Sequence, residues 1–85
     1  MKVITTNNAP AAIGPYSQAI VTGNLVYGSG QIPVDPQTGN IPEGITAQAH
    51  QSCKNVKGLM EAAGTSMEKV VKTTCFLADI KDFAA

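Results

Sequence analysis

Residues 25–34, LVYGSGQIPV, decide the fold of this chain, because the stretch begins as a strand and then departs from one. Its first three residues are bulky and fit a pleated surface. Gly28 and Gly30 flank Ser29, and glycine in a strand marks a bulge or a close approach by another group. Pro33 has no N–H to donate and ends the pairing. The stretch predicts a strand end that offers a hydroxyl and bare backbone amides to a small ligand; the alternative is a structural bulge alone.

An antiparallel hairpin is expected to lead into this strand end. Residues 17–22 and 25–29 predict two strands, and the Gly-Asn pair at 23–24 is typical of a type II′ turn. Partners in such a hairpin have numbers that add to about 47, which places Tyr16 within reach of Ser29. From spacing alone, Tyr16 is better explained as a structural tyrosine with a packed ring and a backbone-bound hydroxyl.

A helix is predicted in the second half of the chain. Apolar residues recur at steps of three and four over residues 46–63, with Thr46 as the N-cap and Gly64 directly after the end. His50 falls on the opposite, polar face, so it is interpreted as a solvated helix residue.

Two further strands are predicted, one at the start of the chain and one after the helix. Residues 2–6 alternate and predict a short first strand, and residues 70–78, VVKTTCFLA, predict a further strand after the helix. The strand predicted at 70–78 is apolar on both faces, whereas one helix covers only one face, which indicates self-association. A second helix is expected to start at Asp79 or Asp82.

Composition limits the classes of function. The chain has 85 residues, 44% of them hydrophobic and only 14% charged, which favours a single domain with part of its surface buried against identical copies. Six lysines balance six acids, and the absence of arginine and of net charge argues against a nucleic-acid partner. Cys53 and Cys75 are expected to be free and buried, and no metal site is expected, because the chain does not supply four well-spaced ligands. No stretch of about 18 apolar residues or secretory signal is present, so we expect a cytoplasmic protein without a membrane partner.

Three runs carry a resemblance to a known family: GPYSQAI at 14–20, GSGQIPVDPQTGN at 28–40 and EAAGTSMEKVVKTTCFLADIKDFA at 61–84. With them the chain resembles the Rid (YjgF-type) family of reactive-intermediate deaminases over essentially all its length. The resemblance implies an α+β fold like that of the small chorismate mutases, with a mixed sheet and helices packed on one face. It also implies a homotrimer with ligand sites between subunits. Residues 1–85 would form a single Rid-type domain that lacks the family's usual C-terminal helix and strands.

The same resemblance implies a function and its residues. The typical activity is hydrolysis of 2-imino acids, released by pyridoxal-phosphate dehydratases, to 2-keto acids and ammonia, with no metal or organic cofactor. Tyr16 matches the cleft tyrosine and is expected to be catalytic, while Ser29 and Gly30 of the SGQ motif are expected to line the substrate cleft with it. The family's asparagine, its carboxylate-binding arginine and its glutamate have no counterparts. Without an arginine, the chain has no fork-shaped clamp for a carboxylate, so we expect weak or absent turnover.

Three alternatives stay open. The chain is also consistent with a non-catalytic module that binds small carboxylates or assembles with a partner. A ribonuclease or translation inhibitor is disfavoured by the zero net charge. A small structural domain is the third alternative.

Overall fold

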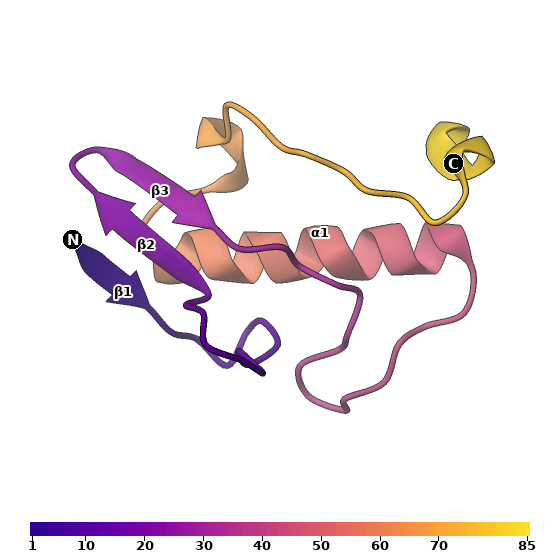
Figure 1. The fold of residues 1–85 in the computed structure, drawn as a ribbon, viewed down its shortest axis with the longest axis horizontal. Coiled ribbons are helices and arrows are strands. Elements are labelled where there is room, and N and C mark those ends of the chain that lie inside the picture. Colours follow the sequence, from indigo (N-terminus) through magenta and orange to yellow (C-terminus); the bar gives the residue numbers. More distant parts are fainter.

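The computed structural model describes residues 1–85 and shows one small sheet with one α-helix packed on a single face (Figure 1). The sheet is antiparallel throughout, in the order β1-β2-β3. The α-helix follows the hairpin, and two short 3₁₀ helices follow the α-helix. The elements are β1 (Lys2–Ile4), β2 (Ala19–Thr22), β3 (Leu25–Gly28), α1 (Ile45–Ala62), η1 (Met67–Lys69) and η2 (Ile80–Ala84).

The predicted hairpin and its register are confirmed. Ala19 lies opposite Gly28, so the partner numbers add to 47. Gly23 has a φ of 58° while no residue other than glycine has a positive φ, which is the type II′ pattern. The strands are shorter than predicted, but the N–H of Ser29 donates to the carbonyl of Gln18 at 2.9 Å, which continues the register by one pair.

A small core joins the sheet to the helix. Ile4 and Ala19 from the sheet pack against Leu59 and Met60 of α1, and all four side chains are buried. The alternation predicted for the first strand puts Val3 and Ile4 on opposite faces, and in the structure Ile4 is buried while Val3 is exposed. The core therefore lies between one face of the sheet and the C-terminal half of α1.

The start of the helix differs from the prediction and its end agrees. Gly44, with a φ of 89°, is the N-cap, so Thr46 already lies inside α1 and its expected capping role is wrong. Gly64, with a φ of 85°, follows the end of the helix as predicted. Its N–H donates to the carbonyl of Glu61, and the N–H of Thr65 donates to that of Met60, both at 3.0 Å, which is a Schellman motif.

The buried face of α1 is confined to its second half. Its buried residues lie between Asn55 and Met60, and Figure 1 shows the N-terminal half running past the end of the sheet. Cys53 and Cys75 are free as expected, but both are exposed, so their expected burial is wrong. The reason is that no strand lies beneath the part of the helix that carries Cys53. His50 is exposed, as predicted.

The strand predicted at residues 70–78 is not formed. Residues 70–78 run from η1 to η2 without regular structure and pair with no strand (Figure 1). The expected mixed sheet is therefore wrong for this chain, because the strand expected to add to β1–β3 stays unpaired. Asp79 caps the next element by accepting a hydrogen bond from the Lys81 N–H at 2.9 Å, but that element is a 3₁₀ helix. No helix has the length and apolarity that a bilayer crossing demands.

Candidate functional site

A hollow of about 220 Å³ lies at the end of the hairpin where the sequence predicts a ligand site. The loop between β1 and β2 forms one wall, and the loop between β3 and α1 forms the other. The structure brings Tyr16 and Gly30 together in this hairpin-end hollow, whereas Ser29 lies next to Gly30 without lining it. The lining residues are Pro10, Ala11, Ile13, Tyr16, Gly30, Gln31, Ile32, Val34, Asp35, Pro36 and Gly39.

Tyr16 stands at the edge of the hollow, outside the sheet. Its N–H donates to the carbonyl of Gly14 at 2.8 Å, so residues 14–16 form a tight turn before β2 begins at Ala19. Its side chain is 51% exposed. Extending the hairpin register by three pairs beyond Ala19–Gly28 would place residue 16 opposite residue 31, and Tyr16 and Gln31 do line the same hollow.

The Ser29 hydroxyl is half-buried and already has one partner. The Gln31 side-chain amide donates to Ser29 Oγ and to the Ser29 carbonyl, each at 3.4 Å. A hydroxyl that accepts one bond keeps its own proton to donate. Ser29 and Tyr16 make no hydrogen bond with each other, so the two hydroxyl groups act independently in this structure.

Free backbone donors are the feature of the hollow that the SGQIP sequence best explains. The N–H groups of Gly30, Gln31 and Ile32 donate no hydrogen bond within the chain, and Pro33 has no N–H. These donors do not pair with β2, because the chain leaves the sheet after β3 and Pro33 has no N–H to continue the pairing. Backbone N–H groups of this kind bind carboxylate and other anionic oxygens with short, charge-assisted hydrogen bonds.

Asp35 is the only charged side chain that lines the hollow. Its Oδ1 accepts from the Gln37 N–H at 2.9 Å, and its backbone bonds to Asn40 and Gly39 at 2.8 Å close the turn that follows. Asp35 is therefore engaged in holding the loop. An anionic ligand would meet neutral donors here and no cation.

Gln18 fixes the first wall of the hollow. Its side chain is 4% exposed and binds the loop before β2: Oε1 accepts from the Thr6 N–H at 2.8 Å, and Nε2 donates to the Pro10 carbonyl at 2.7 Å. Nε2 also lies 3.2 Å from the Thr6 carbonyl and 3.4 Å from that of Ala9. The side-chain amide of Gln18 thus supplies hydrogen-bond partners to backbone groups of a loop that is not paired in the sheet.

Asn55 fixes the second wall from the helix. Its side chain is fully buried, and Nδ2 donates to the carbonyls of Ile32 and Val34 at 3.0 and 2.9 Å. Its Oδ1 accepts from the side chain of Gln51, one turn earlier, at 2.9 Å. The loop that carries the free amides is therefore tied directly to α1.

Neither amide was identified as part of a site from the sequence. Gln18 falls within the GPYSQ run, and Asn55 lies one turn before the core residue Leu59. The signal that identifies Asn55 is its position four residues before Leu59, on the same side of the helix, because burial of an amide requires hydrogen-bond partners.

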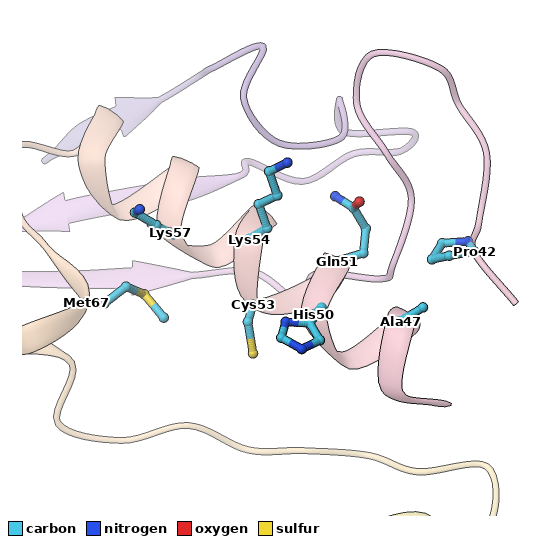
Figure 2. A pocket seen from close by; sticks show the side chains of 8 residues that line it. All are labelled: Pro42, Ala47, His50, Gln51, Cys53, Lys54, Lys57 and Met67. Carbon is cyan, nitrogen blue, oxygen red and sulfur yellow. The ribbon is translucent and has the colours of Figure 1, made fainter. Parts of the chain in front are cut away.

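A second, wider hollow of about 730 Å³ lies against α1 (Figure 2). Most of its lining comes from the polar face of the helix, including His50, Lys54 and Lys57, with Met67 facing them from the η1 side. It contains none of the residues predicted for the site. No group of three or more His, Cys, Asp or Glu side chains comes together anywhere in the chain to hold a metal ion.

Solved structures share this fold. The crystal structure of the YjgF gene product from Escherichia coli superimposes with a TM-score of 0.96 and is 55% identical, covering 99% of this chain and 66% of that one. A crystal structure of E. coli TdcF with bound serine gives a TM-score of 0.96 at 50% identity. The chain thus has the YjgF-type fold.

Sequence comparison identifies the family. The family described as "Endoribonuclease L-PSP" matches residues 6–85. A RutC family protein of Pasteurella multocida is 58% identical over 84 residues, covering 99% of this chain. The 2-iminobutanoate/2-iminopropanoate deaminase of E. coli K12 is 55% identical over 83 residues, covering 98%. The chain belongs to this Rid/YjgF/RutC family, which confirms the predicted resemblance. It spans 65% of the length of both relatives.

Proposed function

We propose that the hairpin-end hollow is the substrate site of a 2-imino acid deaminase, in which Tyr16 is catalytic and Ser29 and Gly30 help to bind the substrate. The observation that carries this proposal is the run of free backbone N–H groups from Gly30 to Ile32 beside the Tyr16 side chain. The 55% identity to 2-iminobutanoate/2-iminopropanoate deaminases supports the choice of substrate class.

Hydrolysis of a 2-imino acid requires few catalytic groups. Water attacks the carbon of the C=N bond, and the nitrogen gains protons and leaves as ammonia, so the product is a 2-keto acid. No metal or organic cofactor takes part in these steps. The protein's role is to hold the anion, orient the water and supply hydrogen bonds to the reacting group. In this proposal the free amides bind substrate oxygen atoms, and the Tyr16 hydroxyl donates to the C=N group.

The hollow also explains why we expect low activity from these 85 residues. No cation lines it, and the chain contains no arginine. Loss of a buried, hydrogen-bonded charge partner weakens binding by about 2–5 kcal/mol, which corresponds to a decrease of about 30-fold or more. Turnover by the residues described here is therefore weak.

We further propose that the protein assembles as a homotrimer and acts in the cytoplasm. The face of the sheet opposite α1 supports assembly: Val3, Ile20 and Tyr27 lie side by side across the three strands. Val3 is 59% exposed and Tyr27 61%, so this apolar row has no cover within one chain. Light scattering after size exclusion tests the assembly, and a monomer at all concentrations would refute it.

A coupled assay tests the activity. A threonine dehydratase generates 2-iminobutanoate, and the appearance of 2-ketobutyrate is followed with this chain or with the E. coli deaminase added. We expect an acceleration that is measurable but at least about 30-fold below that of the relative. Acceleration equal to the relative's would refute the weak-turnover proposal, and none at all would refute catalysis by these residues.

A non-catalytic module that binds small carboxylates is the second candidate, because the hollow offers donors without a cation. Titration with 2-ketobutyrate separates the two candidates. Binding that depends on Tyr16 without any turnover supports the module, whereas turnover that is lost in Tyr16→Phe supports the deaminase.

A further inference from the structure

The wider hollow against α1 is lined by basic side chains and by no acidic one. Its volume of about 730 Å³ lies within the range of small-molecule sites. Lys54 and Lys57 line it together with His50, whereas no aspartate or glutamate does (Figure 2). The chain as a whole has no net charge, so the two lysines are a local concentration of positive charge.

The spacing of these side chains along α1 differs from that of an ordinary solvated face. His50, Lys54 and Lys57 follow one another at steps of four and three residues, which places them on one side of the helix. Opposite charges at this spacing stabilise a helix and like charges destabilise it. Lys54 has no acid three or four residues away in either direction, and Glu61, four residues after Lys57, does not line the hollow.

A neutral donor is held in place beside the lysines. The side-chain amide of Gln51 donates to Oδ1 of the fully buried Asn55 at 2.9 Å, and Gln51 also lines the wider hollow. An amide nitrogen carries two protons, so a second N–H stays available for a ligand. Because Asn55 is itself bonded to two loop carbonyls, the direction of the Gln51 amide is set before a ligand arrives.

The remaining lining indicates which kind of anion fits. Pro42 lies on the loop before α1, Ala47 lies in the first turn of the helix, and Met67 faces the lysines from η1 (Figure 2). A phosphate monoester carries almost two negative charges and three acceptor oxygens at neutral pH, and lysine binds phosphate as a point charge. It therefore offers acceptors to both lysines and an organic group to the apolar part of the lining, which inorganic phosphate does not.

We infer that the wider hollow is a binding site for a small phosphate monoester. Lys54 and Lys57 bind the phosphate oxygens, the free N–H of Gln51 and the imidazole of His50 donate further hydrogen bonds, and Met67 contacts the organic group. No residue lines both this hollow and the hairpin-end hollow, so the inference does not depend on the proposed deaminase activity.

Calorimetric titration of the 85-residue chain with phenyl phosphate, at neutral pH and low salt, tests the site. We expect saturable binding with a dissociation constant of about 1 mM or lower, because two charge-assisted contacts are made. Phenol lacks the phosphate and should bind at least about tenfold more weakly. Inorganic phosphate lacks the organic group and should bind at least about threefold more weakly.

Charge-matched variants locate the binding. Lys54→Gln and Lys57→Gln each remove one positive charge from the hollow, and Lys2→Gln removes one from β1, outside it. We expect each of the first two to weaken phenyl phosphate binding about tenfold and the third to weaken it less than about twofold. Circular dichroism and the urea midpoint of each variant confirm that it stays folded.

Several results would overturn the inference. Binding that does not saturate below about 10 mM, or an equal loss in Lys2→Gln, would mean that phosphate is attracted without a site. Phenol or inorganic phosphate that binds as tightly as phenyl phosphate would contradict the monoester as ligand. Stronger co-sedimentation with vesicles of phosphatidic acid than with phenyl phosphate present as competitor would support the site, whereas vesicle binding that phenyl phosphate does not reduce would assign the lysines to a membrane surface.

Discussion

Replacing Asn55 with aspartate is a direct test of how α1 holds the wall of the hairpin-end hollow. Aspartate has almost the same volume and can still accept the bond from Gln51, but it has no protons to donate to the carbonyls of Ile32 and Val34. The substitution therefore removes two hydrogen bonds, of 3.0 and 2.9 Å, and leaves the packing nearly intact.

The expected loss can be worked from this geometry. Each donated bond contributes about 1 kcal/mol net, and a buried acceptor left without a partner costs about 1–3 kcal/mol more. Asn55 is fully buried, so its charged replacement also faces two carbonyl oxygens without water. The Ile32 carbonyl keeps the Val34 N–H as a donor, so only the Val34 carbonyl is left without a partner. We therefore expect Asn55→Ala to lower the free energy of unfolding by about 3–5 kcal/mol, and Asn55→Asp by at least as much because of its buried charge.

Urea denaturation at neutral pH and fixed protein concentration measures both values, with Gln51→Ala as the matched control. That control removes the donor to Asn55 Oδ1 but leaves both bonds to the loop carbonyls in place, so it should cost about 1–3 kcal/mol, less than Asn55→Ala. If Asn55→Asp proves milder than Asn55→Ala, side-chain volume rather than donation to the loop carries the contribution of Asn55, and the reasoning is refuted.

Other substitutions test the remaining contacts. A Cβ at Gly58 would lie 2.9 Å from that of Asn8, so Gly58→Ala should destabilise the chain by about 1–3 kcal/mol in the same urea titration; a neutral effect would mean that the loop yields freely. Leu59→Ala should cost about 2–5 kcal/mol, because Leu59 is 1% exposed at the centre of the core; a smaller loss would indicate that the core collapses around the gap. Gly64→Ala should cost about 1 kcal/mol or more in thermal unfolding, because a φ of 85° strains any side chain; no loss would show that the Schellman turn can relax. Tyr16→Phe should weaken 2-ketobutyrate binding about fivefold in a calorimetric titration without changing stability, and unchanged affinity would remove the hydroxyl from the site.

Local signals in the sequence were sufficient for the hairpin and for the end of the helix. The Gly-Asn pair at 23–24 determines a turn by its own backbone preferences, and Gly64 ends α1 for the same reason. These features depend on few residues close together in the chain. Their prediction therefore required no knowledge of tertiary contacts.

Features that depend on distant contacts were predicted less well. The composition of residues 70–78 favours a strand, but a strand exists only where a partner pairs with it, and the described residues offer none. The burial expected for Cys53 was wrong because periodicity finds the apolar face of a helix without showing how far a sheet extends beneath it.

The candidate site was predicted in part. The SGQIP run indicated both the strand end and its bare amides, and Tyr16 and Gly30 do line one hollow. Gln18 and Asn55 were missed, because their importance depends on which loop carbonyls the fold brings to them. Whether Ser29 contacts a ligand stays a prediction for the binding experiments above.

The two walls of the hollow are anchored in different layers of the molecule, one through Gln18 on the sheet side and one through Asn55 on α1. The width of the hollow is consequently coupled to the spacing between helix and sheet. A ligand that draws the walls together also presses α1 onto β1–β3, so occupancy and core packing reinforce each other. Affinity should then respond to substitutions deep in the interior that never touch the ligand.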